Sequence, residues 1–211
     1  MPVAKRPGLF FLRQFLSQPR MVGSIVPTPK ATVRALLDPI DWHETHCVVE
    51  FGPGTGVFTR ELLRRVGRHS RVIAIDTNPV FANYLRASIR DPRLISVHGS
   101  AADVGRIVAA HGFGHADHVI SGLPFSTIPR PVADAIMDAS AQVIRPGGAF
   151  LIYQYSRFVL PMLQARFSRV DQGFTWRCIP PARLFWARQT EPESTKTIIT
   201  RAGVAESSAA A

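Results

Sequence analysis

Residues 48–56 read Val-Val-Glu-Phe-Gly-Pro-Gly-Thr-Gly, an apolar run that carries an acid near its end and then has glycine at alternate positions. Apolar runs rich in β-branched residues are typical of buried parallel strands. Alternate glycines allow a sharp turn whose backbone lies open to a ligand. Residues 58–65 then have the length of a short helix, whose first N–H groups would face the same ligand. The segment predicts a strand, a binding turn and a helix.

A glycine turn alone also fits an ordinary connection, but a second motif follows it. Residues 71–76 read Arg-Val-Ile-Ala-Ile-Asp, a further apolar strand that ends in Asp76. This acid lies about 20 residues after the glycines, where nucleotide-binding folds place the carboxylate that binds the ribose hydroxyls. The glycine spacing differs from the Gly-x-Gly-x-x-Gly pattern of dinucleotide sites. A pyrophosphate is therefore not the expected ligand.

Three more apolar segments have the length of strands, and each adjoins small or turn-forming residues. We expect strands at 94–98, 117–121 and 149–155, the last after a turn at 145–148. Strands that alternate with helix-length segments predict right-handed crossovers and a parallel sheet. A strand pair within about 167–188 would close the sheet. Ligands of such sheets bind beyond the carboxyl ends of the strands, where the motifs gather.

Five elements in this order and spacing resemble the motif set of class I S-adenosylmethionine-dependent methyltransferases: residues 50–56, Asp76, 99–103, 121–125 and 145–148. The resemblance runs from about His46 to Tyr155. It implies an α/β fold with a Rossmann-like, seven-stranded, mostly parallel sheet. It also implies S-adenosyl-L-methionine as cofactor and S-adenosyl-L-homocysteine as product.

The resemblance also implies which residues contact the cofactor. The glycines would pass beneath its methionine portion, Asp76 would hold the ribose, and Ser100 and Ala101 would flank the adenine. Many members have an acid where Ser100 stands, so the contact to the adenine amino group would pass to backbone or to Asp103. The cofactor-binding set expected in this way is Glu50, Gly52, Gly54, Gly56, Asp76, Thr77, Ser100, Ala101, Gly122 and Leu123.

Composition bounds what surrounds this core. The 211 residues suit one methyltransferase domain, expected at 21–201, with a disordered tail at 202–211. The formal net charge is +10, which favours an anionic partner or surface. The two cysteines have no metal-like spacing, so we expect no metal site. No apolar run reaches the ~18–20 residues of a membrane-spanning helix.

The first 20 residues predict a short amphipathic helix. Pro7 can open it and Pro19 must end it. Leu9, Leu12 and Leu16 share one face, while basic residues lie beside that face and ahead of it. Such helices lie in the headgroup layer of anionic membranes. The alternative is a lid that packs across the cofactor pocket, and the two roles are compatible.

Residues 21–29 contain prolines that exclude a helix, and Thr28 is expected to cap a helix at 29–37. Residues 10–13, 19–27 and 121–125 resemble the signature segments of bacterial phospholipid N-methyltransferases. Those enzymes convert phosphatidylethanolamine stepwise to phosphatidylcholine. The resemblance implies phosphatidylethanolamine as substrate and an anionic phospholipid surface as partner. It implies a cytoplasmic enzyme held peripherally at the inner face of the cell membrane, and we expect a monomer.

Methyl transfer to an amine requires alignment more than reactive side chains, because the sulfonium is already a good leaving group. Methylated ammonium products favour aromatic faces. Phe125, Tyr153 and Tyr155 are candidates to provide these faces, although aromatic residues there also suit a core. Arg157 is the candidate for the lipid phosphate. Ser121 completes the expected catalytic set, and His98 and Asp103 are either bases or structural residues.

Two alternatives come from other classes. Residues 50–56 and 121–125 also resemble ribosomal RNA adenine dimethyltransferases, which have Asn-Leu-Pro-Tyr at the fourth strand. Ser121 lacks the amide that would accept from the base, and RNA offers the apolar face of the first helix no partner. A membrane adaptor that only binds the cofactor is the third hypothesis. We favour the lipid methyltransferase.

Overall fold

The structure is a computed structural model of the chain, and it describes residues 28–176 and 181–190. The predicted helix at 1–20, residues 21–27 and the predicted tail at 202–211 lie outside the described residues. Among the helices of the described residues, none is both long enough and apolar enough to cross a membrane.

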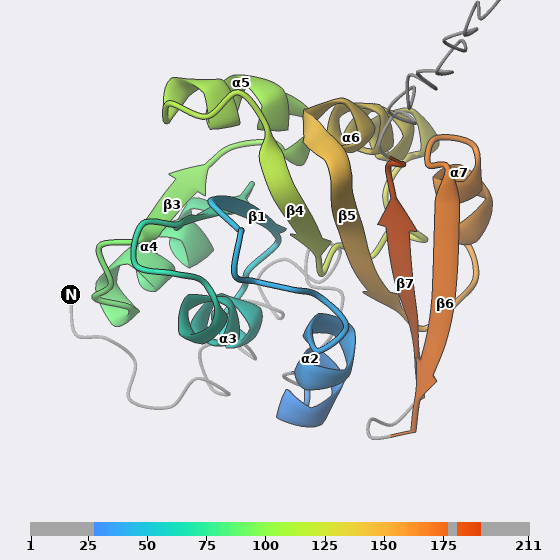
Figure 1. Cartoon of the computed structure of the whole chain (residues 1–211), viewed down its shortest axis with the longest axis horizontal. Helices are drawn as coiled ribbons and strands as arrows, with labels where there is room; N and C mark the ends of the chain where they lie inside the picture. Colours follow the sequence, from blue (N-terminus) through green and yellow to red (C-terminus); the bar gives the residue numbers. More distant parts are fainter. Residues whose placement is uncertain (1–27, 177–180, 191–211) are drawn as a thin grey trace, which may run out of the picture.

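A seven-stranded sheet forms the centre of the protein, with strand order β3-β2-β1-β4-β5-β7-β6 (Figure 1). The first five strands in that order are parallel, whereas β7 is antiparallel to both of its neighbours. This confirms the predicted Rossmann-like sheet and the strand pair that closes it. The strands are β1 (Cys47–Phe51), β2 (Arg71–Asp76), β3 (Leu94–His98), β4 (Ala116–Ser121), β5 (Ile144–Gln154), β6 (Arg169–Thr175) and β7 (Ala182–Arg188).

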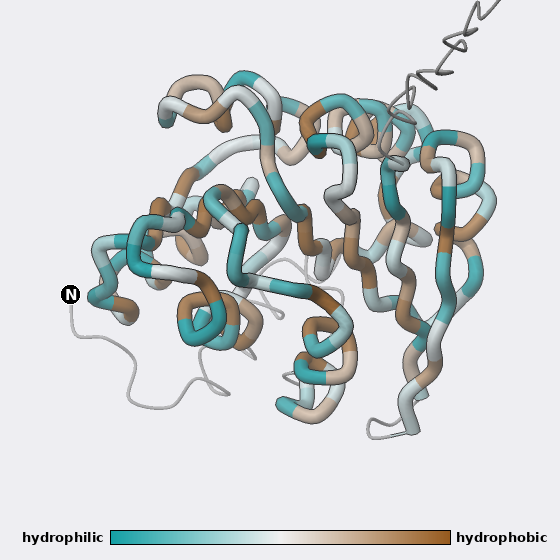
Figure 2. Tube along the Cα trace, in the orientation of Figure 1, coloured by the Kyte–Doolittle hydropathy of each residue, from teal (hydrophilic) through white to brown (hydrophobic). Residues whose placement is uncertain are grey.

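Helices cover both faces of the sheet because neighbouring strand residues point to opposite sides. Val48 packs in a cluster with residues of α2 and α3, whereas Val49 packs in a cluster with residues of α5, α6 and α7. Hydrophobic residues gather along the strands and on the sheet-facing sides of the helices (Figure 2). The helices are α2 (Lys30–Leu37), α3 (Val57–Arg65), α4 (Pro79–Ser88), α5 (Val104–Ala110), α6 (Arg130–Val143) and α7 (Leu160–Gln164), with a 3₁₀ turn η1 (Ala101–Asp103).

The turn predicted at 145–148 is a bulge inside β5. Ala116 pairs with Ile144 and His118 with Ala149, so a single residue of β4, Asp117, faces four residues of β5. The Asp117 carboxylate accepts hydrogen bonds from the backbone N–H groups of His46 and Cys47 and from the Arg145 guanidinium. A Cβ at position 148 would overlap the Asp117 carbonyl oxygen, so the bulge requires a glycine there. The strand therefore begins earlier than predicted and ends before Tyr155.

Thr28 does not cap α2, contrary to the sequence prediction. Pro29 occupies the N-cap position, and no side chain caps the helix there. The Thr28 hydroxyl instead lies 2.7 Å from the Tyr153 hydroxyl. The residue thus joins the segment before α2 to the end of β5, a contact between positions too distant in sequence to be predicted.

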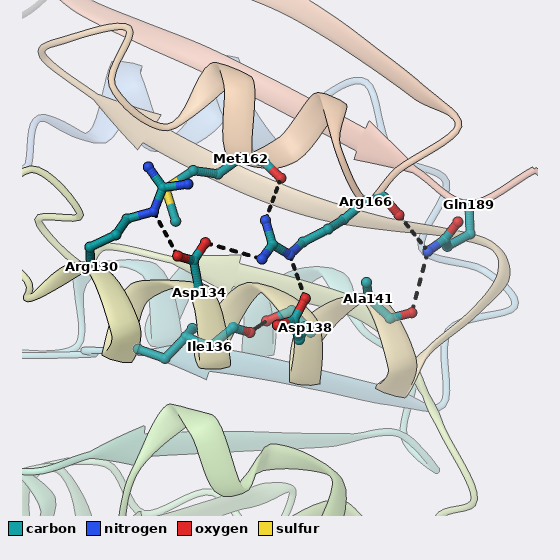
Figure 3. Close-up of polar contacts among 9 residues, drawn as sticks. Arg130, Asp134, Ile136, Asp138, Ala141, Met162, Arg166 and Gln189 are labelled. Carbon is teal, nitrogen blue, oxygen red and sulfur yellow. Dashed lines mark hydrogen bonds and ion pairs between the residues drawn. The ribbon is translucent and has the colours of Figure 1, made fainter.

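Charged side chains fasten α7 to α6 (Figure 3). The Arg166 guanidinium, which follows α7, forms ion pairs with Asp134 and Asp138 of α6, and Asp134 also pairs with Arg130. Gln189 donates to the carbonyl oxygens of Ala141 and Arg166 and so ties the end of β7 to the same corner. These contacts join α6, the segment after α7 and the end of β7.

Candidate active site

A cavity of about 850 Å³ opens at the carboxyl ends of the parallel strands. Its walls come from the turn after β1, the ends of β2 and β3, the loop between β4 and α6, and the end of β5. These are the places where the sequence concentrates glycine and short polar residues. The sheet topology alone would favour a ligand site at this edge.

The glycine turn forms the floor of the cavity. Gly52 and Gly54 line it with left-handed φ values of 64° and 52°. A Cβ on Gly52 would lie 3.0 Å from the Leu123 side chain, across the cavity floor. Gly56 has a φ of 80° but does not line the cavity. A Cβ on Gly56 would lie 2.6 Å from Leu85, so this glycine serves the packing of α3 against α4.

Glu50 lies beneath the turn, within the core, and does not line the cavity. Its carboxylate accepts a hydrogen bond of 2.6 Å from the Thr59 hydroxyl. Burial raises the pKa of Glu50 to about 7, partly opposed by the hydrogen bonds from Thr59 and reinforced by the negative charge of Asp76. Glu50 can therefore influence a ligand only through the turn that covers it.

Asp76 lines the cavity at the end of β2, and Thr77 lies beside it. Burial raises the pKa of Asp76, while the N–H groups of Asn78 and Gly54 and the nearby His98 oppose this shift. Among the described residues that line the cavity, Asp76 has the only charged side chain. Its carboxylate could accept two hydrogen bonds from the vicinal hydroxyls of a ribose.

Asn78 is a cavity residue that the sequence analysis missed. Its Oδ1 accepts from the Val80 N–H and caps α4. Its Nδ2 is buried and has no hydrogen-bond partner among the described residues, although the side chain lines the cavity. A buried amide without a partner costs free energy unless a ligand or water accepts from it. The geometry therefore provides a donor next to the Asp76 acceptor.

The third wall comes from the residues after β3. Ser100 and Ala101 line the cavity, and the Ser100 hydroxyl accepts from the Ala102 N–H. Asp103 and His98 do not line it. Asp103 lies near Arg106 on the exposed side of the turn, and the His98 ring contacts the Thr77 carbonyl oxygen. The cavity thus contains neither of the side chains considered as bases.

The segment after β4 divides into cavity residues and core residues. Gly122 and Leu123, both predicted to bind the cofactor, line the cavity. Ser121 and Phe125 are fully buried and do not line it. The Ser121 hydroxyl accepts from the Leu123 N–H and so shapes the turn. Gln154, missed in the sequence, donates to the Leu123 carbonyl oxygen at 2.6 Å and holds the same turn against β5.

Aromatic rings form a further part of the cavity wall. Tyr153 stacks on Phe58 with ring centroids 5.6 Å apart, and it meets Tyr155 edge to face at 6.3 Å. All three line the cavity, and Tyr155 is 42% exposed. Arg157 is exposed, two residues past Tyr155, and does not line the cavity.

Comparison with known proteins decides the family. A family described as a methyltransferase domain matches residues 48–148. An ornithine lipid N-methyltransferase of Singulisphaera acidiphila is 30% identical over 184 residues, which cover 84% of this chain and 94% of that protein. This chain belongs to the class I S-adenosylmethionine-dependent methyltransferases. It is a methyltransferase that uses S-adenosylmethionine as cofactor and releases S-adenosylhomocysteine as product.

Solved methyltransferase structures share the fold. The N-methyltransferase NodS of Bradyrhizobium japonicum, in complex with S-adenosylhomocysteine, has a TM-score of 0.63 at 13% identity, over 88% of this chain and 99% of that chain. A 16S rRNA methyltransferase of T. thermophilus, in complex with its cofactor and guanosine, has a TM-score of 0.59 at 18% identity, over 79% of this chain and 44% of that chain. Likenesses at this identity establish the fold and leave the acceptor open.

The cavity of this methyltransferase fits the cofactor. The unpartnered Asn78 amide and the Asp76 carboxylate offer a donor and an acceptor to a ribose, and the floor at Gly52 leaves no room for a Cβ. Ser100 and Ala101 could flank the adenine. When bound, S-adenosylmethionine supplies a methyl group on a sulfonium. The chain itself would align the cofactor and would place the carboxylate of Asp76 in the cavity.

Proposed function

We propose that this methyltransferase transfers methyl groups to the primary amine of a membrane lipid. The observation that carries the proposal is the 30% identity to an ornithine lipid N-methyltransferase over 94% of that protein's length. An ornithine side chain and an ethanolamine headgroup both end in a primary aliphatic amine. Our specific proposal is phosphatidylethanolamine and its mono- and dimethyl forms as substrates, with phosphatidylcholine as product at the membrane surface.

The aromatic wall supports a substrate that becomes a methylated cation. Each transfer leaves a positive charge on the nitrogen, and cations with methyl groups are stabilised over aromatic faces. Phe58, Tyr153 and Tyr155 present such faces to the cavity. Tyr155 is partly exposed, so we assign it the position nearest the entering headgroup. Arg157, exposed just beyond it, is the proposed ligand of the lipid phosphate.

The amine must lose a proton before it can attack. A headgroup ammonium has a pKa of about 9–10, by analogy with lysine. Entry into the cavity beside the cofactor cation would lower this value because both desolvation and like charge disfavour the ammonium. Among the described residues of the cavity, none is a histidine or a lysine. We therefore propose that the proton leaves to solvent at the mouth rather than to a dedicated base.

A comparison of possible methyl acceptors tests the proposal. The protein is incubated with methyl-labelled S-adenosylmethionine and, in separate reactions, with vesicles that contain phosphatidylethanolamine, vesicles that contain an ornithine lipid, or protein-free ribosomal RNA. We expect label on phosphatidylethanolamine, with mono-, di- and trimethyl products resolved by mass spectrometry. Label on the ornithine lipid alone would keep the lipid class and change the headgroup. Label on RNA alone would refute the lipid proposal.

A further inference from the structure

The tip of the β6–β7 hairpin presents an exposed aromatic pair. Phe174 is 44% exposed and Trp176 is 78% exposed. The two residues are two apart in the chain, so their side chains leave on the same side of the hairpin. Their rings meet edge to face with centroids 4.7 Å apart. Contiguous apolar surface that is exposed to water is typical of contact sites.

A cation lies directly beside this pair. Arg183 of β7 is the cross-strand partner of Phe174, and its guanidinium lies 5.7 Å from the centre of the Phe174 ring. Residues 172–176 and 181–185, the described parts of the hairpin tip, contain no acidic residue. We name Phe174, Trp176 and Arg183 the hairpin patch. Its surface is apolar and positively charged at once.

The hairpin patch lies at the same end of the sheet as the cavity. Arg183 pairs with Gln154 of β5, and Gln154 lines the cavity. The tip of the hairpin and the end of β5 meet at one edge of the molecule (Figure 1). The chain continues from Gln154 into Tyr155, at the cavity, and then into Phe158, which is 43% exposed. Exposed aromatic side chains are thus present both on the hairpin patch and in the segment that follows the cavity end of β5.

We propose that the hairpin patch inserts into the headgroup layer of an anionic phospholipid bilayer and holds the cavity mouth against the membrane surface. The inference rests on the proposed lipid substrate, because only such a substrate requires the cavity to meet a bilayer. Tryptophan and phenylalanine favour the membrane interface, and arginine is attracted to an anionic leaflet. The net charge of +10 favours the same surface.

The intrinsic fluorescence of Trp176 can report whether the hairpin patch of the intact protein contacts a membrane. Of the three tryptophans, Trp42 is 8% exposed and Trp186 donates its indole N–H to the Leu36 carbonyl oxygen, so Trp176 is the one in water. Vesicles of phosphatidylglycerol and phosphatidylcholine contain no primary amine, so they report surface contact without substrate. We expect them to shift the emission to shorter wavelength and brominated phosphatidylcholine in them to quench it. Trp176→Phe should abolish both changes while the protein still sediments with the vesicles.

A vesicle sedimentation series then measures the contribution of the patch. The double variant Phe174→Ser, Trp176→Ser should bind the same vesicles about tenfold more weakly. Val80→Ser is the matched control, since Val80 is 43% exposed on α4, outside the patch. It should bind as the wild type does. Activity of the double variant on a short-chain, monomeric phosphatidylethanolamine should be unchanged, because no patch residue lines the cavity.

The outcomes separate this inference from the proposed function. Trp176 emission that stays unshifted on vesicles that the protein does bind would overturn the inference. An emission shift that depends on protein concentration and needs no vesicles would overturn the inference in favour of contact with a second copy of the protein. An emission shift with RNA alone would overturn it in favour of nucleic acid. If the vesicle results hold but no lipid is methylated, the proposed substrate fails and the surface contact stands.

Discussion

Two buried polar side chains at opposite ends of the same sheet are treated differently by the fold. Asp117, at the amino end, accepts from two backbone N–H groups and from Arg145. Burial opposes its ionisation, but these hydrogen bonds outweigh burial and lower its pKa. Asn78, at the carboxyl end, keeps a buried Nδ2 without a partner among the described residues. The Asp117 carboxylate is thus fully engaged by partners within the fold, whereas the Asn78 amide has a donor left for a ligand.

This difference separates side chains that stabilise the folded state from side chains that remain free to bind a ligand. Residues that satisfy one another contribute to the free energy of unfolding and bind nothing else. Unpaired groups in a cavity cost stability until a ligand completes them. Variants at the amino end should therefore change stability, and variants at the cavity should change affinity.

The largest effect is expected at the amino end. Asp117→Ala removes the acceptor of two backbone N–H groups and the partner of Arg145, so we expect the free energy of unfolding to fall by about 3 kcal/mol. Urea denaturation measures this change. Asp171→Ala is the control, because Asp171 pairs with Arg169 and Arg188 at the surface and should cost less than about 0.5 kcal/mol. Equal losses in the two variants would break the comparison.

Cofactor affinity should fall most on loss of the cavity carboxylate. Asp76→Ala removes the carboxylate proposed to accept from the ribose, so we expect binding of S-adenosylhomocysteine to weaken by about 2.5 kcal/mol. It also removes the acceptor of the Asn78 and Gly54 N–H groups, so we expect some loss of stability as well. Isothermal titration calorimetry measures the affinity. Asp103→Ala, an exposed acid outside the cavity, is the matched control and should bind normally. An unaltered affinity of Asp76→Ala would remove Asp76 from the site.

Glu50 shares features with both ends of the sheet. It is buried under the cavity floor, but it does not line the cavity. Its raised pKa, about 7 against 4.5, means that the folded state holds the proton more tightly. This contribution to stability is present at low pH and is lost as pH rises through about 7, so between pH 5 and 8 it should decrease by about 2 kcal/mol. Glu50→Gln should remove this dependence, measured by denaturation at both pH values. Exposed Glu44→Gln should retain the wild-type dependence.

The smallest predicted effect is the most specific. Asn78→Ser keeps an oxygen that can cap α4 but removes the unpartnered amide. We expect stability within about 0.5 kcal/mol of the wild type and cofactor binding weakened by about 1 kcal/mol. Calorimetry and denaturation on the same samples separate the two quantities. Loss of stability with unchanged affinity would make Asn78 a structural cap only.

Strands β1 to β4 were largely predictable because each contains apolar residues and ends at an acid or directly before a glycine. The bounds of β2 and β3 agree with the prediction, since Asp76 and Gly99 mark their ends. The bulge at 145–148 was mistaken for a turn before the strand. A run of Arg-Pro-Gly-Gly indicates a change of direction, but only the pairing with Asp117 shows that the strand continues on both sides.

Side-chain direction at the cavity was less predictable. Phe125 follows the turn after β4, and its side chain is buried in the core. This direction was not predicted because the sequence does not show how the backbone of that turn is oriented. The pair Asn78-Pro79 does indicate a helix start, with asparagine as cap and proline at the first helical position. The sequence does not show that the Asn78 Nδ2 is left without a partner among the described residues, because this depends on side chains distant in the sequence. The contact between the Thr28 and Tyr153 hydroxyls was not predicted either, because the two residues lie far apart in the sequence.

Amide hydrogen exchange with and without S-adenosylhomocysteine tests the central claim most directly, that the cofactor binds at the carboxyl end of the sheet. We predict slower exchange in peptides covering 52–56, 76–78, 99–101 and 122–123, and no change at the opposite end, in peptides covering 46–47 and 116–118. Protection confined to the opposite end, or no protection anywhere in folded protein, would contradict the account.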